Sequence, residues 1–184
     1  FVITQLDGAG CSNMGNFPIL PISGKLGVSP NDMNGYDKYE KILKSTAGHL
    51  SLSMKDDIIV DLTVSKRSGI AKFNFSESPL GTLIIGSGIN SSDSKKISDA
   101  YIKITSPSSV EGYSKGGDFC GTEINYKIFF AAKFNTGAME TGTWKDKRVS
   151  LKKITSGRNS GAYFTFNTSI VKDISYQIAI SFVS

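Results

Sequence analysis

The side chains that could carry out chemistry are few and widely spaced in this chain. His49 is the single histidine, so any serine or cysteine nucleophile would have to take it as its base. No Gly-x-Ser-x-Gly segment offers such a serine, and Cys11 or Cys120 would need this same histidine and a broken bridge. Asp56 and Asp57 are neighbours, and neighbours in a strand point to opposite faces, so we expect turn residues rather than an acid–base pair. We predict no catalytic residue and a chain that is not an enzyme.

Metal and cofactor sites are not expected either. A metal site needs clustered ligands, which the spacing of the two cysteines does not provide. The other dense acid pair, Asp93 and Asp99, is not part of a loop of alternating acids that would bind calcium. Residues 82–90 resemble the opening of a dinucleotide-binding fold, but Ser91 stands where a glycine should be, and no amphipathic helix follows. We therefore predict no metal and no cofactor.

The first residue and the two cysteines indicate the cellular compartment of the protein. The chain begins at Phe1, from which we expect a removed leader and export to the periplasm, the cell surface or the medium. In an oxidising compartment Cys11 and Cys120 would pair and close a loop of about 110 residues, which chain-entropy models value at about 4–5 kcal/mol. Two free buried thiols are the alternative. No apolar run approaches the roughly 18 residues that span a bilayer, so no membrane insertion is expected.

The net charge of +5 is carried almost wholly by lysine. The lysines are scattered among serines and acids, which indicates a solvated basic surface. Nucleic-acid binding would need an arginine-rich stripe with interleaved aromatic residues, and arginine occurs only at Arg67, Arg148 and Arg158. Nucleic acid is therefore not an expected partner.

The pattern of apolar residues predicts one all-β domain over residues 1–184. In residues 174–182 the apolar residues alternate with polar ones, which is typical of a strand with one buried face. Residues 36–44 are the only helical candidate, and they could equally form a strand. About ten short strands with turns every 8–12 residues predict an antiparallel β-sandwich, immunoglobulin-like or jelly-roll-like, with at most one short helix. The expected strands are residues 1–6, 17–22, 49–54, 58–64, 70–75, 82–85, 97–105, 124–134, 148–154, 162–171 and 174–182, with long loops at 107–119 and 135–143.

Binding of a sugar is the function that the loops favour. Sugars are held by planar polar side chains, by backbone groups and by an aromatic face. Loops 88–93, 111–118 and 155–160 are the richest in such groups, and Trp144 is the only tryptophan. The candidate ligand-binding residues are Tyr113, Asp118, Asn90, Asp93, Trp144, Arg158 and Asn159.

The C-terminal segments resemble a known family. A strand at 124–134, a glycine-bounded loop at 137–142, a strand at 148–154, a polar turn at 155–161 and a strand at 162–171 are similar to the N-terminal lectin domains of chaperone–usher fimbrial tip adhesins. The resemblance implies a domain that attaches to a host cell-surface glycan without catalysis. It also implies other pilus subunits and a periplasmic chaperone as partners, through a pilin domain after Ser184. The cysteines of familiar members lie closer together than Cys11 and Cys120, so no sugar-contacting residue is carried over.

Three alternatives stand beside this interpretation. A structural pilus subunit would need a donor strand to complete its sheet. An unrelated secreted β-protein, such as a toxin or phage receptor-binding module, would fit the same strand pattern. An enzyme would have to be built from one histidine and scattered acids.

Overall fold

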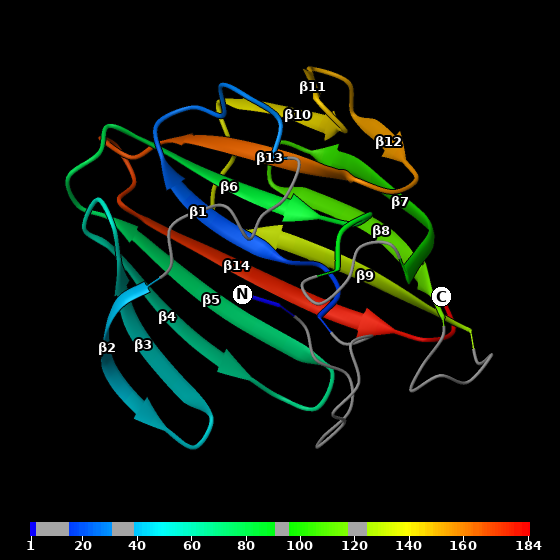
Figure 1. Cartoon of the computed structure of the whole chain (residues 1–184). Coiled ribbons are helices and arrows are strands. Elements are labelled where there is room, and N and C mark those ends of the chain that lie inside the picture. Colours follow the sequence, from blue (N-terminus) through cyan, green and yellow to red (C-terminus); the bar gives the residue numbers. More distant parts are fainter. Residues whose placement is uncertain (3–14, 31–38, 91–95, 118–124) are drawn as a thin grey trace.

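In the computed structural model, two antiparallel sheets face each other across a shared apolar core (Figure 1). The structure describes residues 1–2, 15–30, 39–90, 96–117 and 125–184. Fourteen strands and no α-helix occur in these ranges. The expected all-β antiparallel sandwich is confirmed, with more strands than the ten or so predicted.

The smaller sheet has five strands. Their order is β1 (Ile19–Ser23), β6 (Leu80–Gly86), β13 (Ser160–Asn167), β10 (Glu140–Lys145) and β11 (Arg148–Ser150). Strand β1 lies at the edge of this sheet, which suits Pro21, because proline has no backbone N–H to donate to a neighbouring strand. Strand β10 lies partly in the expected loop 135–143, so that part of the loop prediction is wrong. Its buried side chains are mostly Thr and Gly, which produce no apolar alternation.

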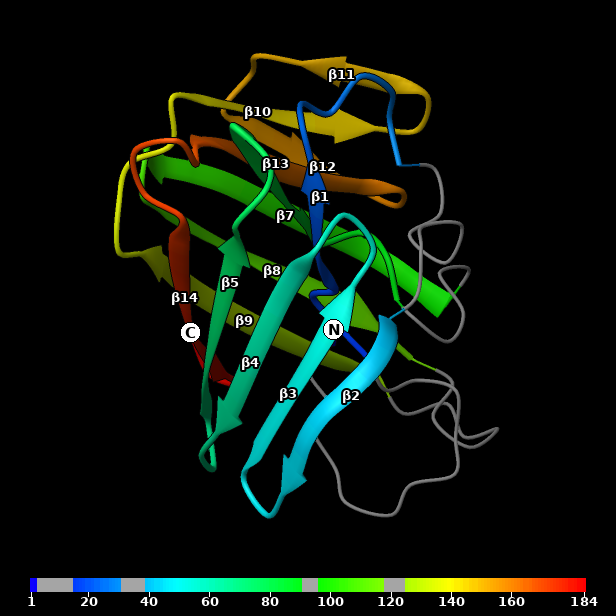
Figure 2. The ribbon, with the colours of Figure 1, turned by 90° about the vertical axis from the view of Figure 1, so that its left-hand side faces the viewer.

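The larger sheet has nine strands. Their order is β12 (Ile154–Ser156), β7 (Ile97–Ser106), β8 (Ser109–Gly116), β9 (Tyr126–Phe134), β14 (Asp173–Ser181), β5 (Ser68–Phe75), β4 (Ile58–Val64), β3 (His49–Met54) and β2 (Tyr39–Thr46). Figure 2 shows β2, β3 and β4 extending beyond the smaller sheet. Strand β2 covers most of the helical candidate and is exposed along its whole length.

Two further predictions about strands were wrong. The expected loop 107–119 contains β8, whose core-facing residues are Val110, Gly112, Ser114 and Gly116. Three of these four residues are small, so the sequence shows no apolar period there. The expected strand 148–154 is divided between β11 and β12, which belong to different sheets.

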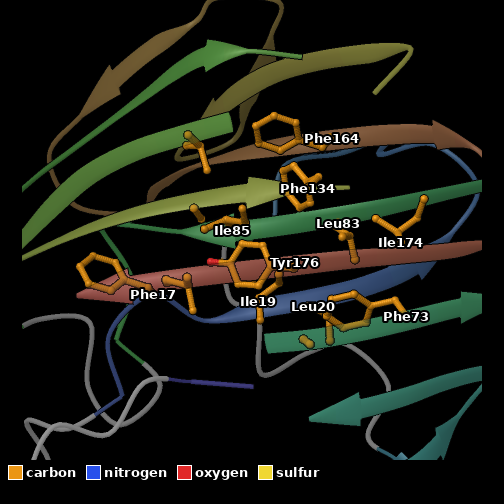
Figure 3. Packing of buried hydrophobic residues seen from close by; sticks show 14 of the residues in the cluster. Phe17, Ile19, Leu20, Phe73, Leu83, Ile85, Phe134, Phe164, Ile174 and Tyr176 are labelled. Atoms are coloured by element: carbon orange, nitrogen blue, oxygen red, sulfur yellow. The ribbon is translucent and has the colours of Figure 1, made fainter. Parts of the chain in front are cut away.

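Aromatic rings fill the space between the sheets (Figure 3). Phe134 of the larger sheet lies 4.7 Å from Phe164 and 5.3 Å from Phe166 of the smaller sheet, measured between ring centroids. It also lies 5.5 Å from Tyr176 on the neighbouring strand. Burial of a side chain of this size contributes about 1.5–3 kcal/mol to stability. The core is therefore built from contacts between residues far apart in the chain.

A second apolar cluster lies on the other face of the smaller sheet. It packs Trp144 with Tyr163, Ile84, Leu26 and Ile89. Gly161 pairs with Trp144 across the sheet, and a Cβ at Gly161 would collide with the indole ring. The glycine thus makes room for the tryptophan.

The last strand is central rather than peripheral. Strand β14 lies between β5 and β9 and pairs antiparallel with both. Ile174, Tyr176 and Ile178 point into the core, as the alternation predicted. Among the described residues no helix has the length and hydropathy needed to span a membrane.

Candidate functional site

The outer face of the larger sheet carries a row of three aromatic side chains. Tyr101 on β7 pairs with Tyr113 on β8, and Tyr113 pairs with Phe129 on β9. Adjacent ring centroids in the row are 5.9 Å apart. Because side chains alternate along a strand, the core-facing neighbours of these residues turn the rings outward. The row is thus set by the register of three strands.

Charged groups border this aromatic row. The Tyr113 hydroxyl donates a hydrogen bond of 2.8 Å to Asp99 Oδ2. That hydrogen bond, with smaller effects of desolvation and of nearby charge, raises the pKa of Tyr113 above its ordinary value. Lys127 Nζ lies 3.8 Å from the centroid of the Tyr113 ring, a cation–π contact. Lys127 Nζ also lies 4.8 Å from the centroid of the Phe129 ring, so one cation is in contact with two of the three rings.

A row of small side chains runs beside the aromatic row. Ala179 on β14 pairs with Ala131 on β9, and both are exposed. The row continues to Ser68 on one side and to Glu111 on the other. Small side chains between larger ones leave a depression in the sheet surface.

This depression is a shallow groove with two lobes of about 510 and 450 Å³. Glu111, Ala131 and Ala179 line both lobes. The first lobe is bounded by a third row of side chains, which includes Ile70, Gln177 and Lys133; the second is bounded by the aromatic row and by Ser184. We define the outer-face groove as the surface formed by these three rows on β5, β14, β9, β8 and β7.

A buried polar cluster lies on the inner side of the same sheet. Asn16 Nδ2 donates to Ser114 Oγ at 3.1 Å, and the Tyr126 hydroxyl donates to Asn16 Oδ1 at 3.1 Å. Burial raises the pKa of Tyr126, and its hydrogen bonds with Asn16 and Asn90 act in the opposite direction. Asn16 and Ser114 are fully buried and Tyr126 is partly buried, and the three side chains supply hydrogen-bond partners to one another, as burial of polar groups requires.

The structure separates the residues that the sequence proposed as ligand contacts. Tyr113 lies in the aromatic row on the outer face of the larger sheet. Asn90 is buried beside Tyr126, and Trp144 is only 1% exposed, so neither presents its side chain to a ligand at the surface in this structure.

The remaining proposed contacts lie elsewhere. Arg158 is exposed in the turn before β13. Asn159 has a left-handed φ of 53° and donates from Nδ2 to Asp146 Oδ1 at 3.2 Å. Its backbone N–H donates to Gly88 O at 2.9 Å, so the turn at 157–160 is joined to the loop that contains Asn90. Asp93, Asp118 and the proposed bridge between Cys11 and Cys120 lie outside the described residues.

Groups for acid–base or metal chemistry are dispersed in the part of the chain that the structure describes. His49 Nε2 lies 3.4 Å from Asp61 Oδ1 on the outer face, with 37% and 36% of the two side chains exposed. No cluster of three His, Cys, Asp or Glu side chains suited to a metal ion occurs among the described residues.

Sequence reasoning missed most of the outer-face groove. Tyr101, Phe129 and Lys127 were not proposed, nor were the two paired alanines. The alternation in 97–105 and 124–134 already places Tyr101 and Phe129 opposite the core-facing residues. Their juxtaposition with Tyr113, however, depends on β8, which the sequence did not reveal.

Comparisons with protein families and with solved structures point to the same family. The model of the family described as glycosyl hydrolase family 92 N-terminal domain matches residues 1–181. No match is found among curated proteins.

Three solved structures share the fold. The first is a family GH92 alpha-mannosidase from Bacteroides thetaiotaomicron, with TM-score 0.76 and 20% identity over 93% of this chain and 25% of the other. The second is the family GH92 glycosyl hydrolase ccman5, with TM-score 0.77 and 18% identity over 98% and 25%. The third is a family GH92 inverting mannosidase from Bacteroides thetaiotaomicron VPI-5482, with TM-score 0.75 and 18% identity over 91% and 22%. The chain spans about a quarter of the length of these proteins.

Proposed function

We propose that this chain, which belongs to the glycosyl hydrolase family 92 N-terminal domain family, is the N-terminal β-sandwich domain of an α-mannosidase. The family match over residues 1–181 carries the proposal. The solved structures that share the fold include two proteins whose names state mannosidase activity. Mannosides are accordingly the proposed substrate class of the whole protein.

This membership corrects the interpretation as a fimbrial adhesin. The family match covers almost the whole chain, whereas the resemblance to lectin domains rested on a strand-and-turn pattern in the C-terminal segments. A pattern of this kind is shared by many sandwiches, because it reflects alternation and turn chemistry rather than a site. The prediction that the chain has no part in an enzyme is wrong for the same reason. The expected partners, which were a host glycan, other pilus subunits and a chaperone, depended on the adhesin interpretation and are wrong as well. The family match also contradicts the alternatives of a pilus subunit, a toxin or a phage module.

We propose that the carboxyl groups that react with the substrate do not come from this domain. Glycoside hydrolysis usually takes two carboxyl groups on either side of the bond, about 5–10 Å apart. In the described ranges, four acids pair with cations on the surface: Glu140 with Lys25 at 3.0 Å, Asp61 with His49 at 3.4 Å, Asp173 with Lys72 at 3.4 Å and Glu111 with Lys103 at 3.7 Å. We place the carboxyl groups that act on the substrate in the part of the polypeptide beyond residue 184.

Export to an oxidising compartment stays a prediction of the sequence.

A hydrolysis assay on the full-length protein tests this function. We expect it to release mannose from α-mannosides, and to leave β-mannosides and α-glucosides of the same aglycone intact. A full-length variant with both reacting carboxyl groups of the C-terminal part replaced by amides should keep its fold and lose this activity. A full-length protein that is folded and inert on a panel of α-linked mannosides would contradict the proposal.

A further inference from the structure

We propose that the corner of the molecule formed by β10, β11 and β12 binds the surface of an anionic lipid membrane. We define the basic corner as residues 145–158, which run from the end of β10 through β11 and β12 to the turn before β13. The inference goes beyond the proposed function, because it concerns where the protein is held and not which bond it hydrolyses.

The basic corner holds the whole excess of positive charge in the chain. It contains six lysine or arginine side chains and one acid, Asp146. The chain as a whole has 21 cations and 16 acids, which leaves fifteen of each for all other residues. The lysines are scattered along the sequence, but their excess over the acids is not. A concentration of one sign of charge at one place attracts partners of the opposite sign.

The fold gathers these cations into one exposed patch. Lys145 pairs with Arg148 across the β10–β11 hairpin, and Lys145 Nζ donates to a backbone carbonyl of β12 at 2.7 Å. Asp146 N donates to Asn159 O at 2.8 Å, which brings Arg158 beside the same hairpin. Figures 1 and 2 show β10, β11 and β12 together at the top of both views.

The cations of the basic corner form no ion pair with an acid among the described residues. Lys145 and Lys153 donate to neutral groups, and Lys153 Nζ lies 3.1 Å from Thr141 O. The carboxylate of Asp146 accepts from the amide of Asn159 at 3.2 Å rather than from a cation. The four exposed cations that remain available to a ligand are Lys147, Arg148, Lys152 and Arg158.

Two apolar side chains lie exposed between the cations and favour a lipid surface over a soluble polyanion. Leu151 is 69% exposed in the turn between β11 and β12, and Ile154 is 50% exposed on β12. Such side chains can enter the boundary between lipid headgroups and acyl chains while the neighbouring cations stay among the phosphates. Binding to a membrane surface increases with buried apolar area and with attraction to anionic lipids, and the basic corner supplies both.

Protection of sheet edges explains this composition less well. Strands β11 and β12 are edge strands, and lysines at an edge discourage pairing with another chain. Each of the two strands has only three residues, however, so the edge is already short. Exposed Leu151 and Ile154 would also counteract such protection.

Sedimentation of the full-length protein with lipid vesicles tests the proposal. The probes are vesicles of phosphatidylglycerol and phosphatidylcholine, with vesicles of phosphatidylcholine alone as the neutral comparison. We expect the protein to bind the anionic vesicles and not the neutral ones, and the binding to weaken as salt is added, because salt screens the attraction. Equal binding to both kinds of vesicle, or binding to neither, would overturn the proposal.

Two full-length variants of equal net charge locate the binding surface. The test variant carries Lys147→Gln, Arg148→Gln, Lys152→Gln and Arg158→Gln. The control variant carries Lys41→Gln, Lys44→Gln, Lys66→Gln and Arg67→Gln, at exposed positions on β2 and in the turn before β5. We expect the partition coefficient on anionic vesicles to fall at least about hundredfold in the test variant, since each cation near an anionic surface contributes about fivefold. The control should stay within about threefold of wild type. Equal losses would show that net charge rather than the basic corner attracts the membrane, and would overturn the proposal.

Leu151→Gln separates a lipid surface from a soluble polyanion. We expect it to lower partitioning onto anionic vesicles about fivefold and to leave retention on a heparin column unchanged. Val64→Gln is the matched control, since Val64 is 70% exposed outside the basic corner, and it should change neither measurement. A Leu151→Gln variant that binds vesicles as tightly as wild type would assign the corner to a soluble polyanion and would overturn the proposal. None of these measurements uses activity, so an inert protein that binds vesicles would contradict the proposed function alone.

Discussion

Tyr176 brings a polar hydroxyl group into the apolar core. Its ring is surrounded by apolar side chains between the two sheets (Figure 3), and its hydroxyl has no hydrogen-bond partner among the described residues. A buried hydroxyl without a partner costs about 1–3 kcal/mol. Burial also raises the pKa of Tyr176, since the phenolate would lose its hydration.

We expect Tyr176→Phe to increase the free energy of unfolding at pH 7 by about 1 kcal/mol, because it removes the unpaired hydroxyl and keeps the ring. The difference should grow at alkaline pH. A free tyrosine ionises near pH 10, and the raised pKa in the folded state means that the unfolded chain loses this proton first. The contribution of neutral Tyr176 to the free energy of unfolding is therefore at its maximum below about pH 10, and it decreases as the pH rises above this value.

Urea titrations of both proteins from pH 7 to pH 11 measure this difference. The wild type should lose stability above pH 10 more steeply than Tyr176→Phe. A phenylalanine variant that is less stable than wild type at pH 7 would show that the hydroxyl has a stabilising partner.

At the scale of elements, β14 holds the larger sheet together. It joins β5, which precedes it by about a hundred residues, to β9, and both pairings are long-range. Asn74 Nδ2 donates to Asp173 Oδ1 at 2.7 Å and fixes the start of the strand. Loss of core contacts in β14 should therefore weaken both halves of the sheet at once.

Ile174→Ala should decrease the free energy of unfolding by about 2–5 kcal/mol, because Ile174 is fully buried and its removal leaves a cavity. Ile170→Ala is the matched control. Ile170 is 77% exposed just before β14, so its loss should change stability by no more than about 0.5 kcal/mol. Thermal and urea unfolding followed by circular dichroism measure both variants. Equal losses in the two variants would mean that β14 is not the central strand of the sheet.

Across the whole molecule, the charged side chains that form ion pairs lie near the surface. The inner faces of both sheets are mostly apolar, and Glu140, Asp61, Asp173 and Glu111 pair with cations near solvent. We expect such a domain to contribute position and contact area to the proposed α-mannosidase rather than proton transfer.

His49→Ala in the full-length protein tests this view. His49 lies on the outer face of β3, and exposed pairs such as His49 with Asp61 contribute about 0–1 kcal/mol. We expect kcat and KM on an α-mannoside to stay within about twofold of the wild-type values. A hundredfold fall in kcat with an unchanged melting temperature would assign His49 a part in the reaction.

The fold class and the strands with apolar alternation could be predicted from the order of the amino acids. The alternation in β3 and β14 was sufficient, because side chains of a half-buried strand must alternate between core and solvent, and β4 was predicted from its β-branched residues. The structure was needed to reveal β8 and β10, whose buried positions are mostly glycine, serine and threonine rather than apolar residues.

The positions of the aromatic and alanine rows depend on long-range strand pairing. Tyr101, Tyr113 and Phe129 are separated by 12 and 16 positions in the sequence. Their side chains become neighbours because three strands pair in a register that the long-range core contacts select. Such a surface depends on cross-strand pairing, and a one-residue shift of that pairing would turn each ring into the core.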